Sequence, residues 1–309
     1  MTHNMSVDLC GVRLKNPVMT ASGTFGSGEE FSEFFDLNRL GAVVTKGVSS
    51  VPWPGNATPR ICETPSGMLN AIGLQNPGFA VFAQRDLAFL EETLDPGLEG
   101  TKVIVNVCGH SEEEYVDCVE KLAGEKRADL LEINISCPNV KRGGITFGTD
   151  PKGVERITSV VRRVAKQPLI MKLSPNVTDI TEIARAAEAG GADALSMINT
   201  LTAMKLDVAR RTFALANRTG GLSGPAIHPV AVRMVYQCAR AVKIPIIGMG
   251  GIRTAEDALE MIMAGASAVA VGTVSFHDQT AALSVIEGIR EYLERYQVPD
   301  VRDLIGCVG

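Results

Sequence analysis

The sequence predicts an α/β protein folded as a closed (β/α)8 TIM barrel, with insertions that roof the C-terminal face of its strands. Short apolar runs alternate with segments of helical period along most of the 309 residues. Eight of these runs carry apolar residues on both faces, as expected for parallel strands covered on both faces. An open doubly wound sheet is the alternative. A barrel of this length commonly forms one domain, so we expect residues 1–309 to be a single domain.

The elements of this barrel can be placed in order along the chain. Each expected strand is rich in Val, Ile, Leu, Met and Ala, which suits burial on both faces. Glycine follows two of the expected helices, at Gly190 and Gly265, where it commonly ends a helix. We expect strands over 17–21, 42–46, 102–107, 130–136, 168–173, 193–198, 244–249 and 268–272, and helices over 111–123, 151–166, 178–190, 227–242, 254–264 and 280–295.

Two stretches, 47–101 and 199–225, are longer than a strand-to-helix connection requires. Both follow the C-terminal end of an expected strand, which is the end at which barrels build their active sites. We therefore expect both insertions to roof the site and not to form a second domain. Residues 296–309 carry no recognisable motif.

Composition and charge exclude several classes of protein. A net charge of -5 without a basic stripe argues against a dedicated nucleic-acid binder. No apolar run approaches the roughly 18–20 residues of a membrane-spanning helix, and the first residues lack a secretion signal, so we expect a cytoplasmic protein. The histidines are dispersed and the seven cysteines contain no C-x-x-C pair. This pattern predicts reduced thiols and no metal site, so redox chemistry would need an organic cofactor or a partner's metal.

Amides, ammonium groups and glycines stand at the ends of the expected strands. This set suits an oxygen-rich, anionic ligand held by several hydrogen bonds. Glycines after the last two strands favour a phosphate-binding site, although for either loop alone they could simply permit a tight turn. The residues concerned are Ser22, Lys46, Asn106, Asn134, Lys172, Asn199, Thr200, Gly250, Gly251, Gly272 and Thr273.

Two lysines are unusual because they lie inside apolar runs. Lys46 falls within AVVTKGV and Lys172 within LIMKLSP, where a solvated surface position is implausible. A buried ammonium group must be paired or bound to a ligand. Glu132 has the same strand parity as Asn134 and could point inward, so pairing with Glu132 is the structural alternative for one of the two lysines.

Cys137 is the candidate for chemistry. It lies in NISCPN, just past an expected strand, and paired glycines follow at Gly143 and Gly144. The flanking Pro138 and these glycines bracket a segment that could close over the site. A thiol needs only modest electropositive help to act as a base at neutral pH. Five other cysteines are expected to be small apolar residues, namely Cys10, Cys62, Cys108, Cys118 and Cys238, and Cys307 is expected to be incidental.

Several of these strings together resemble the dihydroorotate dehydrogenase family over essentially the whole chain. The most specific are SGMLNAIGLQNPG (66–78) and EINISCPNVKRGG (132–144), supported by ASGTFGSG, KLSPNVTDI, MINT, GGLSGPAI and IPIIGMGGI. The resemblance is strongest to the class 1B catalytic subunit. It implies a barrel that contains FMN and oxidises dihydroorotate to orotate in de novo pyrimidine (UMP) biosynthesis.

The resemblance also implies roles for individual residues. Cys137 would be the base that takes the C5 proton while hydride leaves C6 for flavin N5, and Lys172 would stabilise the reduced flavin. The implied substrate-binding residues are Lys46, Asn70, Ala71, Ile72, Gly73, Leu74, Asn134, Asn199 and Thr200. The implied cofactor-binding residues are Ser22, Lys46, Asn106, Asn134, Lys172, Ile198 and Gly224 around the ring and ribityl groups, with Gly250, Gly251, Gly272 and Thr273 at the phosphate.

A class 1B resemblance further implies an electron-transfer partner. That subunit would carry FAD and a [2Fe–2S] cluster and pass electrons to NAD, in a heterotetramer of two catalytic and two electron-transfer subunits. A cysteine at position 137 resembles the class 1 enzymes, because class 2 members use serine at this position. Class 2 members also carry a membrane segment. No nucleic acid or membrane is implied as a partner.

Four alternatives remain at this level. The chain could be an FMN barrel acting on another dihydropyrimidine, or a class 1A-type enzyme that uses fumarate. A barrel lyase or isomerase without flavin would want a carboxylate acid/base pair at the strand ends, and none is evident. A noncatalytic binding barrel would hold no cofactor and would tolerate any change of Cys137.

Overall fold

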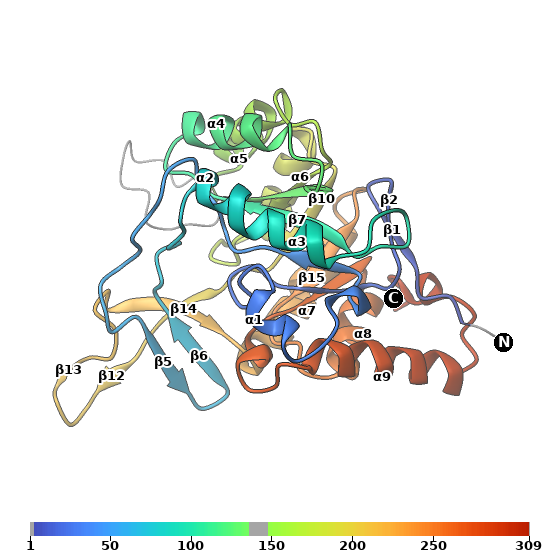
Figure 1. Ribbon diagram of the computed structural model, residues 1–309. Coiled ribbons are helices and arrows are strands. Elements are labelled where there is room, and N and C mark those ends of the chain that lie inside the picture. The colour runs from blue at the N-terminus through green and yellow to red at the C-terminus, as the bar shows by residue number, and fades with distance from the viewer. Residues whose placement is uncertain (1–2, 136–147, 309) are drawn as a thin grey trace.

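The computed structural model describes residues 3–135 and 148–308, and within them eight parallel strands close into a barrel (Figure 1). Every strand pairs with its neighbours along the chain, and the last pairs with the first. The (β/α)8 prediction is therefore confirmed, and the open sheet is excluded. The strands are β3 (Val18–Thr20), β4 (Ala42–Val44), β7 (Lys102–Val107), β8 (Leu130–Asn134), β9 (Leu169–Lys172), β10 (Ala194–Met197), β15 (Ile246–Met249) and β16 (Ala268–Val271).

The expected helices surround this barrel with small shifts at their ends. Each buries one apolar stripe against the strands; in α5, for example, Val154, Ile157 and Val161 are fully buried. Side-chain caps begin several of them, such as the reciprocal pair of Thr254 and Asp257 at the start of α8. The helices are α4 (Glu112–Leu122), α5 (Pro151–Arg162), α6 (Ile180–Ala189), α7 (His228–Ala239), α8 (Ala255–Ala264) and α9 (Ala281–Arg295).

The first insertion, expected to be roof over 47–101, has two parts. Its second part is a continuous helical stretch, α2 (Phe79–Val81), a π-helical turn (Phe82–Leu87) and α3 (Ala88–Thr93), which packs on the barrel wall as the helix between β4 and β7. Buried Phe82, Leu87 and Leu90 anchor it. The preceding connection, from β3 to β4, holds α1 (Glu29–Ser32) and a 3-10 turn (Leu37–Arg39).

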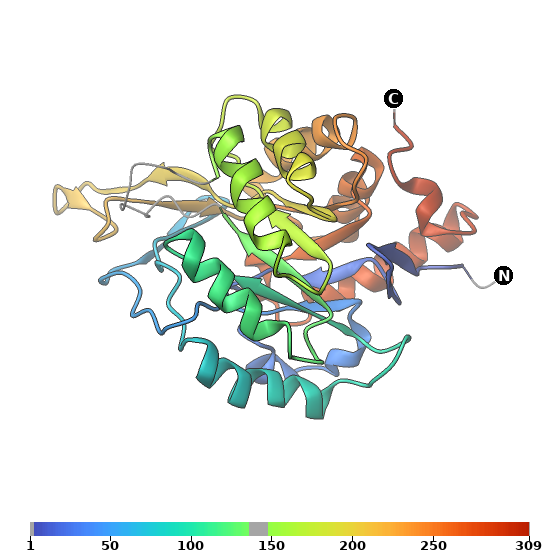
Figure 2. The same cartoon turned by 90° about the horizontal axis from the view of Figure 1, so that it is seen from above.

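The rest of that insertion joins the second insertion in one antiparallel sheet. Strands β5 (Ile61–Thr64) and β6 (Gly67–Asn70) pair with β14 (Thr219–Ser223) and β11 (Leu201–Met204), in the order β11-β14-β6-β5. Leu69 lies opposite Leu222, which ties the two insertions together. A hairpin of β12 (Leu206–Asp207) and β13 (Thr212–Phe213) extends from this sheet. Figures 1 and 2 show the sheet on the side away from both termini.

The opposite end of the barrel is closed by the chain termini. The hairpin of β1 (Val7–Leu9) and β2 (Val12–Leu14) lies there, and the Cys10 thiol donates to the Asp193 carbonyl just before β10. The described part of the C-terminal segment, residues 296–308, which carried no motif, contacts the N-terminal segment: the Asn4 side chain donates to Asp300, which precedes a 3-10 turn (Val301–Leu304). No helix of the described residues has the length and apolar character needed to cross a bilayer.

Candidate active site

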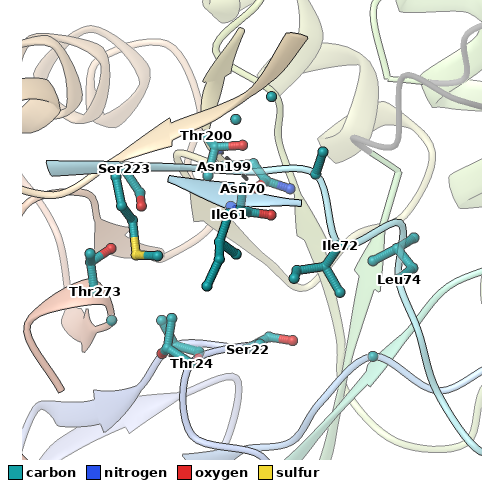
Figure 3. A pocket seen from close by; sticks show the side chains of 18 of the residues that line it. Ser22, Thr24, Ile61, Asn70, Ile72, Leu74, Asn199, Thr200, Ser223 and Thr273 are labelled. Atoms are coloured by element: carbon teal, nitrogen blue, oxygen red, sulfur yellow. Dashed lines mark hydrogen bonds between the residues drawn. The ribbon is translucent and has the colours of Figure 1, made fainter. Parts of the chain in front are cut away.

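A cavity of about 940 Å³ lies at the carboxyl ends of the barrel strands, beneath the roof sheet. Such a volume is near the upper end of the roughly 300–1,000 Å³ typical of small-molecule sites, so it has room for more than one ligand. In Figure 3, Ser22 and Thr24 face Asn199 and Thr200 across this space. The expectation that both insertions roof the site therefore agrees with the structure, apart from the helical stretch described above.

Most of the residues selected from the sequence meet at this cavity. They come from seven barrel strands or the loops after them and from both insertions, although up to 251 positions separate them in the chain. Cys137 lies outside the described residues. The expected residues that line the cavity are Ser22, Lys46, Asn70, Ala71, Ile72, Gly73, Leu74, Asn134, Lys172, Ile198, Asn199, Thr200, Gly250, Gly251, Gly272 and Thr273.

Asn106 and Gly224 do not line the cavity. Asn106 is one residue short of the end of β7, and the chain after β4 continues to pair with it, since the Val48 amide donates to the Asn106 carbonyl. Gly47 therefore covers it: a Cβ at Gly47 would come within 2.8 Å of the Asn106 Oδ1. Gly224 turns the chain after β14 at a φ of 97° and packs directly against Gly67.

Lys172 belongs to a buried polar network below the cavity floor. Its Nζ lies 3.5 Å from the Glu132 Oε1, and the same oxygen accepts a 2.6 Å hydrogen bond from the Asn106 Nδ2. The Glu132 side chain is 1% exposed and that of Lys172 is 6% exposed. Pairing with Glu132, which the sequence left open for one of the two lysines, is therefore found at Lys172. The Lys172 side chain still contributes to the cavity wall.

Lys46 has a different environment. It follows β4 by two residues, and among the described residues no carboxylate comes within 4.0 Å of its Nζ. Burial lowers the pKa of this ammonium group, and the positive charges of Lys172 and Arg60 lower it further, against an opposing effect of Cys108. A partly buried cation without a described counter-ion is suited to bind an anionic ligand.

Amide side chains also line the cavity. The Asn199 Nδ2 donates to the Asn134 Oδ1 at 3.4 Å, and the Asn199 Oδ1 accepts from the Thr200 amide at 2.8 Å. Asn176 connects the loop after β9 to β11, because it donates to the Thr200 carbonyl at 3.0 Å and accepts from the Thr202 amide at 2.8 Å. Each of these groups offers both donors and acceptors, which suits a planar ring with carbonyl and N–H edges.

The sequence did not single out several residues of the cavity. Asn176 and Arg60 both line it, and Arg60 donates to Gln75, which lines it too. The string KLSPNVTDI contains Asn176 and ends the strand of Lys172, so its position could have been noticed. No local pattern marked Arg60, because its place depends on how the insertion folds back over the barrel.

Glycines form the end of the cavity nearest β15 and β16. Gly250 and Gly251 have φ angles of 130° and 73°, which favour glycine. A Cβ at Gly251 would come within 2.7 Å of the His228 Cβ, so the loop can pack against the start of α7 only without side chains. Gly272 precedes a 3-10 turn (Thr273–Phe276) beside it. Bare backbone amides at this end suit a phosphate.

Three of the described cysteines have thiols whose pKa is raised. Burial raises the pKa of Cys10, Cys118 and Cys238 to about 12 in each case. None of these three thiols can serve as a base near neutral pH. The described residues contain no group of three or more His, Cys, Asp or Glu side chains placed to hold a metal ion.

Fold and site together define the class: a (β/α)8 barrel with a roofed, polar, cation-bearing ligand cavity at the carboxyl ends of its strands. The chain belongs to the dihydroorotate dehydrogenase family, whose model matches residues 4–293. The family expected from the sequence strings is thus confirmed.

Curated relatives agree over almost their whole length. A protein of Lachnoclostridium phytofermentans is 66% identical over 99% of both chains, and one of Alkaliphilus metalliredigens is 59% identical over the same share. A protein of Geotalea uraniireducens is 55% identical over 99% of this chain and 98% of its own. All three are named dihydroorotate dehydrogenase B (NAD(+)), catalytic subunit. The similarity to the class 1B subunit noted in the sequence agrees with these names.

Proposed function

We propose that this chain is a single barrel domain that oxidises dihydroorotate to orotate in pyrimidine biosynthesis, as the FMN-containing catalytic subunit of an NAD-linked dihydroorotate dehydrogenase. The observation that carries the proposal is the cavity, which brings together a partly buried lysine with no carboxylate partner among the described residues, an amide cluster and a glycine cradle. The family and the names of the relatives support the same reaction. A location in the cytoplasm is part of this proposal.

The residues present fit FMN. A Cβ at Gly251 would lie 2.7 Å from the His228 Cβ, so this end of the cavity keeps bare backbone amides, which suit the FMN phosphate. Gly250, Gly251, Gly272 and Thr273 would hold the phosphate, and the ring and ribityl groups would lie along Ser22, Lys46, Asn134, Lys172 and Ile198, with Asn106 behind Gly47 and Gly224 beside Gly251. When bound, FMN would supply the acceptor, N5, for the hydride that leaves C6 of dihydroorotate.

The opposite half of the cavity would hold the substrate. The Lys46 ammonium would pair with the carboxylate of dihydroorotate, which would compensate for the cost of burying that charge. Amide groups would bind the ring edges, because they can both donate and accept. The proposed substrate-binding residues are Lys46, Asn70, Ala71, Ile72, Gly73, Leu74, Asn134, Asn199 and Thr200.

Cys137 would act as the base that removes the C5 proton. This role rests on the NISCPN string and on the family, since the residue lies outside the described part of the chain. Asn134, three residues earlier, is held in place through its carbonyl, which accepts a 2.7 Å hydrogen bond from the Tyr115 hydroxyl. The end of β8 is therefore a fixed origin for the segment that carries the thiol.

A separate subunit would take the electrons onward. The relatives' names specify a catalytic subunit and NAD(+), which implies that another polypeptide completes the enzyme. That partner would carry FAD and a [2Fe–2S] cluster, in a heterotetramer of two catalytic and two electron-transfer subunits. Purification of the chain with and without such a partner tests this part: NAD reduction should require the partner, whereas reduction of bound flavin should not.

Replacement of the proposed base tests the chemistry. Cys137→Ala should retain FMN, yet its flavin should be reduced by dihydroorotate at least about 100-fold more slowly, because general-base catalysis typically contributes a factor of this size or more. Anaerobic stopped-flow absorbance measures the rate. Cys62→Ala, which removes a half-buried roof thiol, is the matched control and should behave as wild type. An unchanged rate in Cys137→Ala would disprove the assignment of the base.

A further inference from the structure

His228, the first residue of α7, contacts both the glycine loop and the neighbouring helix. Its Nδ1 lies 2.9 Å from the Gly250 carbonyl oxygen, and its Nε2 lies 3.0 Å from the Glu260 Oε2. The Asp257 Oδ1, also on α8, is 3.9 Å from the Nε2. The imidazole thus bridges the loop after β15 and the helix that follows it.

Both ring nitrogens face oxygen atoms that accept hydrogen bonds. A neutral imidazole has one N–H and one lone pair, so it can donate to the Gly250 carbonyl or to the Glu260 carboxylate, but not to both. A protonated ring donates to both at once. Protonation therefore decides whether the glycine loop and α8 are joined through this side chain or whether a lone pair faces an oxygen.

Two acidic side chains of α8 face the ring. Asp257 and Glu260 are the charged groups within 4.0 Å of it among the described residues, and both are acidic. Burial alone would raise the pKa of Asp257, but hydrogen bonds from Arg253 and Thr254 and the nearby His228 lower it overall. The His228 side chain is 9% exposed, whereas that of Glu260 is 56% exposed.

The contact matters because of the place of Gly250 and Gly251. Both line the cavity at its glycine end, and Gly251 packs on the His228 backbone so closely that a Cβ would lie 3.0 Å from the His228 nitrogen. A loop of two glycines has little stiffness of its own, since both residues have wide conformational freedom. Its carbonyl contact with His228 limits that freedom.

We infer that His228 is a positioning residue for the phosphate end of the cavity, and that its protonated ring clamps the Gly250 carbonyl to Glu260. The inference rests on the proposed binding of FMN there. Binding of the FMN phosphate should then weaken when the clamp is lost, whereas binding of the flavin ring should not. No covalent step is involved, and the ring does not have to contact the ligand.

The clamp is tested by the affinity of the FMN-free chain for FMN and for riboflavin, which lacks the phosphate. His228→Gln should bind FMN about tenfold more weakly at about pH 6, the loss expected for one charge-assisted hydrogen bond, with riboflavin affinity unchanged. Quenching of flavin fluorescence measures both. His110→Gln is the matched control, because His110 also contacts a glutamate, Glu114, but lies on the loop before α4. It should behave as wild type.

A second variant separates the clamp from a general loss of packing. In Glu260→Gln the new amide can donate to the Nε2 of a neutral ring, so both contacts survive without the extra proton. As the pH is raised, the FMN affinity of wild type should fall relative to that of Glu260→Gln, because only the wild-type clamp needs the extra proton. Ionisation of the phosphate itself is common to both proteins and cancels in the ratio.

The outcomes are distinct. A parallel pH dependence in wild type and Glu260→Gln, or equal loss of FMN and riboflavin binding in His228→Gln, would overturn the clamp while leaving the proposed function intact. Failure of wild type to bind FMN at any pH would overturn the proposed function, and the clamp with it. The clamp would be supported if His228→Gln lost affinity for FMN but not for riboflavin, while His110→Gln kept the wild-type affinity for both.

Discussion

Two lysines reach the same cavity from different strands of the barrel, Lys46 after β4 and Lys172 at the end of β9, but their surroundings differ. Lys172 has a buried carboxylate 3.5 Å away, and that carboxylate is also held by Asn106. Lys46 has no carboxylate within 4.0 Å in the described part of the chain, and burial lowers its pKa. The charge of Lys172 is thus balanced within the barrel, while that of Lys46 remains available to a ligand.

This difference explains why two similar sequence patterns serve two purposes. A balanced ion pair contributes to the structure of the site before any ligand arrives, and it costs most when one partner alone is removed. An unbalanced buried cation costs stability in the free protein and regains it when an anion binds. Substitutions at the two positions should therefore affect different quantities, folding in one case and substrate binding in the other.

Removal of the carboxylate should have the largest effect. Glu132→Gln leaves the Lys172 ammonium buried without a counter-ion, so the free energy of unfolding should fall by about 3 kcal/mol. Urea denaturation followed by circular dichroism measures it. The double variant Glu132→Gln with Lys172→Met should recover most of the loss. If the single variant were as stable as wild type, the pair would not be the balanced unit described above.

Removal of the other lysine should reverse the pattern. Lys46→Met should not lower the free energy of unfolding, because a costly buried charge is removed. Its affinity for orotate should fall about 100-fold, the size of effect expected for a charge-assisted contact to a carboxylate. Isothermal titration with orotate measures the affinity, and Lys205→Met, in the exposed roof, is the control. Tight orotate binding by Lys46→Met would contradict the role of Lys46.

A smaller effect should follow from pH. The folded pKa of Lys46 lies below its ordinary value of 10.5, so at pH values between the two the unfolded chain binds the extra proton. The contribution of Lys46 to stability should therefore rise with pH across that window. Orotate affinity should move the other way, falling by at most about tenfold per pH unit above the folded pKa. Lys46→Met should lack both trends, and identical pH profiles for the two proteins would refute them.

Local patterns in the sequence predict the barrel and much of the site. Apolar runs place the strands, and parallel strands in a barrel must bring their carboxyl ends together, which is why Lys46, Lys172 and Asn199 could be assigned to one site. The helix over 79–93 was missed because it lies inside a long stretch taken as roof. Asn106 was predicted at the end of a strand that opens into the site. The chain after β4 continues to pair with β7, however, and separates Asn106 from the cavity.

Contacts between distant segments could not be predicted in this way. Strands β6 and β14 pair across about 150 positions, and nothing in either strand specifies the other. The position of Arg60 depends on that pairing. His228 was likewise unremarkable as one of four dispersed histidines, since its role follows from the meeting of β15, α7 and α8.

The most direct test of the account is an anaerobic visible spectrum of the purified, FMN-loaded chain before and after addition of dihydroorotate. We expect an oxidised-flavin spectrum that bleaches on addition, because FMN and dihydroorotate would share this cavity. A flavin spectrum that stays unchanged would contradict dihydroorotate as the substrate. Failure to bind FMN after reconstitution would contradict the oxidoreductase assignment as a whole.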